Sequence, residues 1–404
     1  PRFVTKKRLL TIIPIGLVLL IIFIFLFSFS TANYKNDNLH AQAVVAEDKK
    51  EIPFVPHYIE TPNQVKAIYM TSWVAGTPRL RDSLIKLIDS TELNSVVIDV
   101  KDYTGRISFA VQNPDLKKFG SEEIRIADLP QFLDVLHQKG IYTIARIAVF
   151  QDAYFVKIRP DLAVKNLGGT AVWKDRKVIS WIDPGAKEYW DYIVLVGKEV
   201  RAAGFDELNF DYIRYPSDGN MHDISYPYSS TTPRTQILKD FFSYLHDHFS
   251  SQSSRRQSSG NTTDTGVKIS VDLFGLTTVA DDDMGIGQML VDALPYFDYV
   301  SPMVYPSHFA TGFDNFKNPA EHPYDVVFKS MSSAVSRANQ TIGLDGATTT
   351  PAKLRPWLQD FDLGADYGAP EVRAQIKATY DVGLSSWMLW SAANTYTVSA
   401  LDAQ

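Results

Sequence analysis

Cysteine is absent from the sequence, and its absence excludes several kinds of chemistry. A chain without a thiol has no disulfide, no thiolate metal site and no cysteine nucleophile. An excess of positive charge is also lacking, because 40 Lys and Arg residues are outnumbered by 46 Asp and Glu residues, for a formal net charge of -6. Such a chain presents no basic field to a phosphate backbone, so we expect no nucleic acid among its partners.

Patterns typical of metal and phosphate sites are missing too. The acidic run at residues 281–283 lacks the ligand spacing of a cation-binding loop, and the Gly-Ile-Gly at 285–287 is too short for a phosphate loop. We therefore expect neither a metal nor a cofactor. What is present is a chain that is 45% hydrophobic and 12% aromatic, enough to build a sizeable core.

One long apolar run, residues 9–29, follows a basic cluster at residues 6–8. As a helix rising about 1.5 Å per residue, a run of this length spans a hydrocarbon core of about 30 Å. The basic cluster is expected to stay in the cytoplasm, so residues 1–30 are predicted to be a single-pass anchor in the cell membrane, with an extracytoplasmic globular part. The alternative is a signal peptide cleaved near the small residues 41–43, which leaves the protein secreted.

Beyond this run, residues 31–62 are polar, with scattered prolines, and predict a flexible linker. From residue 63 to 404, short β-branched runs alternate with segments of helical period, which is typical of parallel β/α units. Eight such units predict a closed (β/α)8 TIM barrel, with a doubly wound open sheet as the alternative. The expected strands are residues 66–73, 95–102, 142–150, 207–215, 267–274, 299–305, 353–361 and 385–390.

Several local signals predict how the helices are placed. Asp128 is expected to cap one helix, and the Asp-Pro at 183–184 to open another. Long loops follow the third to sixth strands, so they gather at the C-terminal rim of the barrel, where barrel enzymes build their sites. The polar returns 250–266 and 339–351 fall on the opposite face. The first barrel helix is expected to face inward with Leu80, Leu84, Leu87 and Ile88.

Charged side chains at the predicted strand ends are the candidates for chemistry. Because side chains alternate along a strand, Asp99 and Lys101 are expected to share a face. Charges turned into a barrel cost several kcal/mol unless they are paired or lie at the wet rim. The residues therefore form either a satisfied ionic network that tops the core or a functional site.

Glycosidic hydrolysis is the reaction that such carboxylates favour, since it needs two of them around the scissile bond. Asp211 and Asp272 end neighbouring predicted strands, which lie about 4.8 Å apart. We expect Asp211 to be the nucleophile, kept ionised by Arg214 or Lys101, and Asp272 to be the acid/base, with a pKa raised by burial. Asp99 and Asp360 are reserve candidates.

Substrate-binding residues are expected around this pair, because sugar rings present apolar C–H faces that stack on aromatic side chains. The expected binding residues all lie at predicted strand ends or on rim loops: Trp73, Lys101, Asp102, Arg146, Tyr212, Arg214, Tyr215, Met303, Tyr305, His308, Gln359, Asp360 and Trp390.

Between about residue 65 and residue 396 the chain resembles the putative glycosyl hydrolase domain family, a former domain-of-unknown-function family. The resemblance rests on VIDVKD at 97–102, FDYIRYP at 210–216, SPMVYPS at 301–307 and RPWLQDF at 355–361. It implies a TIM barrel related to α-amylase-like hydrolases, whose strand-four aspartate is the nucleophile, a role that matches Asp211. The sequence departs from the amylase pattern because Arg214 follows that aspartate, and because Asp272 stands where a glutamate would be the donor.

These observations predict a glycoside hydrolase that acts on an extracytoplasmic polysaccharide or oligosaccharide. The alternative from another class is a catalytically silent barrel that binds a cell-wall carbohydrate. A deacetylase or lyase acting on the same carbohydrate is a further alternative.

Overall fold

The structure is a computed structural model that describes residues 55–250, 266–341 and 350–404. The predicted anchor, residues 1–30, and most of the predicted linker lie outside the described residues, as does nearly all of the polar return 250–266. Within the described residues, no helix combines the length and the apolar character that crossing a membrane requires.

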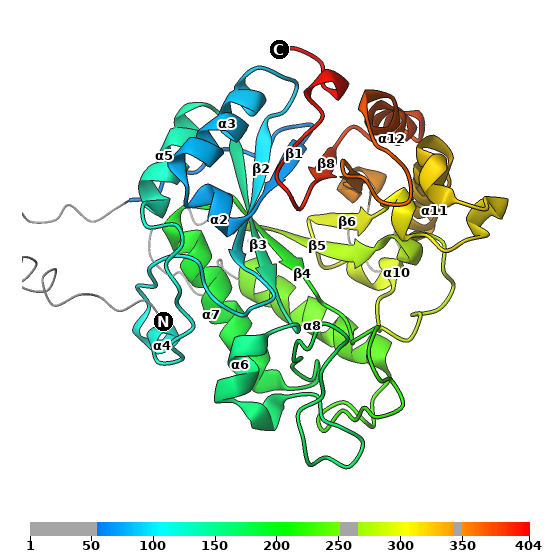
Figure 1. Ribbon diagram of the computed structural model, residues 1–404. Coiled ribbons are helices and arrows are strands. Elements are labelled where there is room, and N and C mark those ends of the chain that lie inside the picture. Colours follow the sequence, from blue (N-terminus) through cyan, green and yellow to red (C-terminus); the bar gives the residue numbers. More distant parts are fainter. Residues whose placement is uncertain (1–54, 251–265, 342–349) are drawn as a thin grey trace, which may run out of the picture. The chain divides into compact units, whose positions relative to one another are not determined.

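Eight parallel strands follow one another around a closed barrel (Figure 1). The barrel is closed by β1 and β8, with Lys66 opposite Trp387. The closed order confirms the (β/α)8 TIM barrel and excludes the open sheet. The strands are β1 Lys66–Met70, β2 Ser95–Lys101, β3 Tyr142–Ala148, β4 Glu207–Asp211, β5 Lys268–Phe274, β6 Tyr299–Met303, β7 Trp357–Gln359 and β8 Trp387–Trp390.

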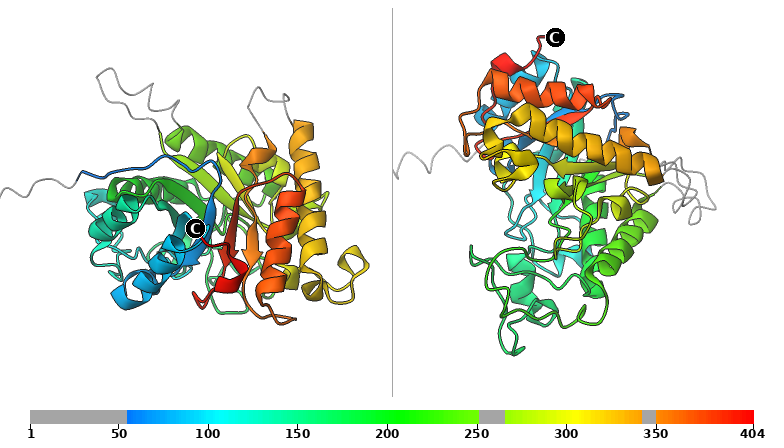
Figure 2. Two further views of the ribbon diagram at one scale, coloured as in Figure 1. Left: turned by 90° about the horizontal axis from the view of Figure 1, so that it is seen from above. Right: turned by 90° about the vertical axis from the view of Figure 1, so that its right-hand side faces the viewer.

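Helices surround the barrel on the outside, and α11 and α12 lie side by side on one flank (Figure 2). The α-helices are α2 Ser72–Ala75, α3 Pro78–Asp89, α4 Pro114–Lys117, α5 Leu129–Gln138, α6 Ala153–Ile158, α7 Lys187–Ala203, α8 Arg234–Phe249, α10 Leu290–Ala293, α11 Pro323–Thr341 and α12 Ala369–Asp381. Short 3-10 helices lie in the loops: η1 Pro160–Leu162, η2 Gly275–Thr278, η3 Pro306–His308, η4 Phe313–Asn315, η5 Pro319–Glu321, η6 Pro351–Lys353 and η7 Val398–Ala400.

Three local predictions about helices need correction. Leu80 is 47% exposed, because α3 turns Ile85 toward the barrel instead. Asp128 stands before α5 but makes no cap bond, since its carboxylate binds Arg81 at 2.6 and 2.8 Å. Asp183 does not begin α7; its carboxylate accepts hydrogen bonds from the backbone N–H of Tyr228 at 2.7 Å and from Ser229 Oγ at 2.6 Å, which ties two loops together.

The seventh strand is shorter than the sequence predicts and begins at Trp357. The proline at position 356 has no N–H to give to a neighbouring strand, which explains the late start. Arg355, just before it, turns into the barrel, where it forms an ion pair with Glu207 that is fully buried on both sides. Ser270 Oγ donates to Glu207 at 2.6 Å, and the Tyr142 hydroxyl donates to it at 3.1 Å. This buried ion pair closes the N-terminal end of the barrel, and Arg355 Nε has no hydrogen-bond partner among the described residues.

Candidate active site

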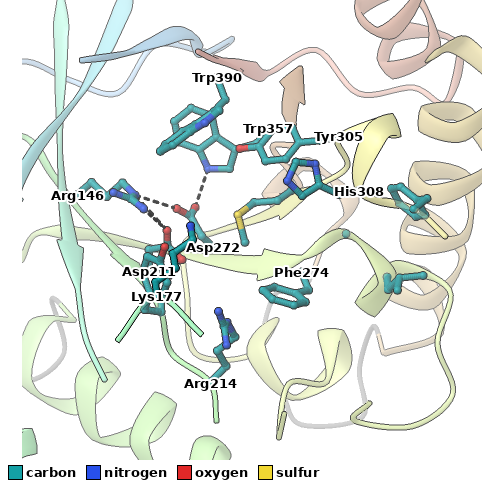
Figure 3. A pocket seen from close by; sticks show the side chains of 15 residues that line it. Arg146, Lys177, Asp211, Arg214, Asp272, Phe274, Tyr305, His308, Trp357 and Trp390 are labelled. Carbon is teal, nitrogen blue, oxygen red and sulfur yellow. Dashed lines mark hydrogen bonds and ion pairs between the residues drawn. The ribbon is translucent and has the colours of Figure 1, made fainter. Parts of the chain in front are cut away.

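The C-terminal ends of the strands surround a cavity of about 400 Å³ (Figure 3). Strands β3 to β8 and the long loops after β3 to β6 supply its walls, as the loop lengths in the sequence predict. The residues that line it are Arg146, Lys177, Asp211, Tyr212, Arg214, Asp272, Phe274, Gly275, Leu276, Met303, Tyr305, His308, Phe309, Trp357 and Trp390.

Arg146, on β3, is the electrostatic centre of this site. Its Nη1 donates to Asp99 Oδ1 at 2.6 Å, and its Nε donates to Asp211 Oδ2 at 3.1 Å. Nη2 donates to the same oxygen of Asp211. The Nε atom also lies 3.9 Å from Asp272 Oδ2. One guanidinium therefore faces three carboxyl groups from three different strands, all of them buried.

Asp272, on β5, is the least hydrated of these carboxyl groups, with 1% of its surface exposed. Burial, and then the negative charge of Asp211, raise its pKa to about 8. Its Oδ1 accepts hydrogen bonds from Asn209 Nδ2 at 2.9 Å and from Trp357 Nε1 at 2.8 Å. Because Oδ1 already accepts two N–H groups, the proton of the neutral form belongs on Oδ2, the oxygen that faces Arg146.

Asp211 ends β4 because the backbone changes direction at the next residue. Tyr212 has a φ of 55°, in the left-handed region that residues with side chains seldom adopt. This turn brings the Tyr212 N–H onto Asp211 Oδ1 at 2.5 Å, while Arg146 binds Oδ2. Both carboxyl oxygens of Asp211 therefore accept hydrogen bonds. The turn also shortens the strand, which the sequence predicted to continue to residue 215.

Asp99 lies behind Arg146 and does not line the cavity. It accepts hydrogen bonds from the Tyr69 hydroxyl and from Arg146, and burial raises its pKa. The Tyr69 ring stacks on Trp390, with ring centres 3.9 Å apart. Asp99 therefore holds Arg146 in place, while Trp390 covers Tyr69 on the cavity side.

Lys101 is placed differently from the prediction. The register shifts between Asp99 and Lys101, so the two side chains do not share a face. Lys101 is fully buried and forms an ion pair with Asp152 at 2.8 Å, behind the barrel wall. Within the described ranges neither Lys101 nor Arg214 forms an ion pair with Asp211. The expectation that one of them would hold that carboxylate was wrong, because Arg146 occupies the position.

Nine of the sixteen predicted site residues line the cavity: Arg146, Asp211, Tyr212, Arg214, Asp272, Met303, Tyr305, His308 and Trp390. Burial lowers the pKa of His308, so it is neutral near pH 7.

The other predicted residues lie outside the cavity wall, and most are engaged elsewhere. Asp102 binds Arg125 at 2.6 Å, and Asp360 accepts from the Thr397 hydroxyl at 2.7 Å. Gln359 Oε1 accepts from Ser307 Oγ at 2.8 Å. Tyr215 is buried against Tyr226, Trp73 is 62% exposed on α2 over Arg125, and Asp99 and Lys101 lie as described above.

Several lining residues were missed by the sequence reasoning. Trp357 lies in a motif that carried the family resemblance, but nothing in its spacing shows that its ring nitrogen reaches Asp272. Lys177 comes from the long loop before α7 and has no periodic signal. Phe274 ends the predicted fifth strand, and its residue type does not show that it and the turn after it border a cavity.

Residues 67–396 match the family described as putative glycosyl hydrolase domain. No curated protein sequence matches the chain. Similar solved structures include the glycoside hydrolase domain of PgaB (BpsB) from Bordetella bronchiseptica, with 15% identity, a TM-score of 0.56, and coverage of 82% of this chain and 95% of that chain.

The α-L-fucosidase isoenzyme 2 of Paenibacillus thiaminolyticus gives 12% identity, a TM-score of 0.54, and coverage of 83% of this chain and 48% of that chain. A hypothetical protein from Ruminiclostridium thermocellum is 28% identical, with a TM-score of 0.42, over 51% of this chain and 96% of that chain. At the identities of the first two, the likeness shows a shared barrel fold. The family match covers most of the chain and confirms the resemblance seen in its motifs, so the chain belongs to the family of putative glycosyl hydrolase domains.

Proposed function

We propose that the protein hydrolyses a glycosidic bond in a polysaccharide or oligosaccharide outside the cytoplasm, with Asp211 as the nucleophile and Asp272 as the acid/base. One observation carries the proposal: a buried carboxyl group whose pKa is raised to about 8 faces the same cavity as a carboxylate bound by arginine. A carboxyl group that keeps its proton beside a second carboxyl group is what acid-assisted glycoside hydrolysis requires.

The spacing of the two groups is compatible with retention of configuration at the sugar. Asp211 Oδ2 and Asp272 Oδ2 lie 3.1 and 3.9 Å from the same nitrogen, Arg146 Nε. The two oxygens are thus separated by no more than the sum of those distances. Retaining enzymes hold their carboxyl groups about 5 to 5.5 Å apart, whereas inverting enzymes need about 6.5 to 9.5 Å to admit a water molecule. That limit, about 7 Å, lies below most of the inverting range, and it is compatible with the retaining reaction that we propose.

In the first step, Asp211 attacks the anomeric carbon while Asp272 Oδ2 gives its proton to the glycosidic oxygen. The bond to the leaving sugar breaks, and an ester links the remaining sugar to Asp211. In the second step, Asp272 takes a proton from water, whose oxygen attacks the anomeric carbon and frees the Asp211 carboxylate. Esterification removes the negative charge that helps to raise the pKa of Asp272, so that pKa falls when Asp272 must act as a base.

The aromatic side chains of the cavity support a sugar as the substrate. Trp390, Trp357 and Tyr305 line one side of the pocket, above Asp272 in Figure 3. The partly exposed ring of Trp390 offers an apolar face to the C–H groups of a sugar, whereas Trp357 is fully buried behind it. Trp357 also donates to Asp272, so one side chain connects the binding wall to the proposed acid.

Location outside the cytoplasm is proposed from residues 1–30 of the sequence, whose basic cluster and apolar run favour a membrane anchor. Protease treatment of intact cells tests it. We expect the barrel to be degraded from outside, whereas protection of the barrel in intact cells would contradict the proposed location.

The central experiment compares the wild type with Asp211→Asn on a panel of purified wall and capsular glycans, by the release of reducing ends. We expect turnover by the wild type and none by the variant, with sugar binding retained. A matched control is Asp183→Asn, a buried aspartate that joins two loops away from the cavity, for which turnover per folded molecule should persist. Glycan binding without product in the wild type would favour a silent binding barrel, and equal product from wild type and Asp211→Asn would refute the nucleophile.

A further inference from the structure

Arg214 is a buried cation without a carboxylate partner. It lines the cavity, is 8% exposed, and forms no ion pair with any part of the chain that the structure describes. Its Nη1 donates to the carbonyl oxygen of Tyr215 at 3.1 Å and to Ser217 Oγ at 3.2 Å, both of them neutral acceptors. The other two arginines buried in the barrel, Arg146 and Arg355, each bind carboxylates directly.

Aromatic rings compensate only part of the cost of burying this charge. The Arg214 guanidinium carbon lies 4.6 Å from the ring centre of Phe274 and 4.8 Å from that of Trp181. Such contacts do not supply the charge-assisted hydrogen bonds that a carboxylate would give to the guanidinium. Burial lowers the pKa of Arg214. Negative charge nearby raises that pKa, but only through space and not through a direct ion pair. It comes from Tyr212, if that side chain is ionised, and from the carboxylates of Asp211, Asp218 and Asp175.

The free guanidinium is directed toward the cavity. In Figure 3 its nitrogen atoms point to the hollow between Asp211 and Phe274. Lys177 lines the same cavity, and its exposed ammonium group has no side-chain partner within the described residues. Two positive groups without counter-ions thus border the space where a substrate of Asp211 would lie.

We propose that Arg214 and Lys177 form a subsite for an oxyanion carried by the glycan, so that the substrate is an acidic rather than a neutral carbohydrate. The planar guanidinium fork matches the two oxygens of a carboxylate, phosphate or sulfate group, and the exposed lysine adds a second positive charge to the cavity wall. An oxyanion here supplies the counter-ion that the chain does not. The inference rests on the proposed function, because it places the charged sugar beside Asp211.

The test measures binding to matched neutral and acidic sugars. The background is Asp272→Asn, which blocks proton donation and preserves the neutral state of that position. The probes are the methyl glucosides and methyl glucuronides, the corresponding galactose pair, and glucose 6-phosphate and 6-sulfate, each titrated by calorimetry or NMR. We expect at least one acidic probe to bind about 10- to 100-fold more tightly than its neutral partner, the range for hydrogen bonds to a charged group. Which probe gains most distinguishes the carboxylate from the phosphate and sulfate.

Two further substitutions locate the effect. In the same background, Arg214→Met should abolish the preference for the acidic probe and leave neutral binding unchanged, whereas Arg214→Lys should restore part of it. Lys177→Met should weaken acidic binding only about 2- to 5-fold, in a salt-dependent manner, because that charge is exposed. Removing an unpaired buried cation should not lower the melting temperature.

Equal affinity for every neutral and acidic pair would overturn the subsite without any further variant. A lower melting temperature of Arg214→Met together with equal loss of neutral and acidic binding would assign Arg214 to packing and also overturn it. These outcomes differ from failure of the proposed function, in which acidic probes bind but the wild type releases no product from any glycan.

Discussion

The two ends of the barrel each enclose an arginine among acidic residues, but in different proportions. At the N-terminal end, Arg355 faces Glu207 alone, and both side chains are fully buried. At the C-terminal end, Arg146 faces Asp99, Asp211 and Asp272 beside an open cavity. Both arrangements bury charge, yet only the second contains more acids than a single cation can neutralise.

The number of acidic groups around each arginine explains why one end of the barrel contributes to stability and the other to the proposed reaction. In a one-to-one ion pair such as Arg355 with Glu207, the two charges balance each other. When three carboxyl groups share one guanidinium, the most buried of them, Asp272, is driven to keep its proton. The excess of acid over base at the rim thereby leaves a carboxyl group that keeps its proton beside Asp211, as the proposed acid/base role requires.

The largest expected effect follows from removing the acid that Arg146 binds most closely. Asp211→Asn should lower kcat by a factor on the order of 10⁴ or more, as removal of a nucleophile does. Its melting temperature should stay near that of the wild type, because Arg146 still binds Asp99. The release of reducing ends and calorimetry measure the two quantities. A large loss of stability in Asp211→Asn would contradict the proposal that the C-terminal end serves the reaction and the N-terminal end serves stability.

Proton donation by Asp272 predicts a pH dependence. Because its pKa is about 8 and the protonated form is the donor, kcat/KM should fall as pH rises through about 8. Asp272→Asn should lower kcat by about 10²- to 10⁴-fold, and less for substrates with a good leaving group. A rate profile that stays flat to pH 9 would remove Asp272 from the role.

The same group predicts how stability depends on pH. Its folded-state pKa lies above the unfolded value of about 4, so its favourable contribution is complete below about pH 4 and is lost as pH rises through about 8. Asp272→Asn removes this loss, so the melting temperature of the variant should exceed that of the wild type at pH 9 by a few degrees. Thermal unfolding at pH 5, 7 and 9 measures the difference; parallel curves would contradict the raised pKa.

At the other end of the barrel the effect should be on stability. Glu207→Gln leaves Arg355 buried without a counter-ion and should lower the free energy of unfolding by about 3 to 5 kcal/mol. Turnover per folded molecule should change little. The double variant Glu207→Gln with Arg355→Met should recover much of the stability in denaturant titrations. A loss of turnover without a loss of stability would assign catalysis to the wrong end.

The smallest effect is expected from Tyr69, whose hydroxyl donates to Asp99 on the side of Arg146 away from the cavity. Tyr69→Phe keeps the ring that stacks on Trp390 but removes the hydroxyl that donates to Asp99. One buried hydrogen bond is lost, so kcat should fall about 5- to 10-fold with KM unchanged. The alkaline limb near pH 8 should also move, because Asp99 acts on Asp272 through Arg146. A fall as deep as that of Asp211→Asn would place Tyr69 in contact with the reaction.

Much of the rim could be predicted from the sequence, because it depends on chain order. Asp211 and Asp272 come at the ends of consecutive strands, and the alternation of β and helical segments predicts that such ends meet at one rim. Lys101 failed as a prediction because a single irregularity in β2 changes which side of the wall a side chain occupies. Nothing in the residue types around position 101 marks that irregularity.

By itself, the sequence determined the eight units, the closed barrel that they build, and the set of acids carried to its C-terminal rim, since these depend on periodicity and on the length of the loops. Only the tertiary structure decided which cation those acids share, which of them keeps its proton, and which arginine is left without an acid. Those outcomes depend on distances of a few ångströms between side chains far apart in the chain, and on how much water reaches them.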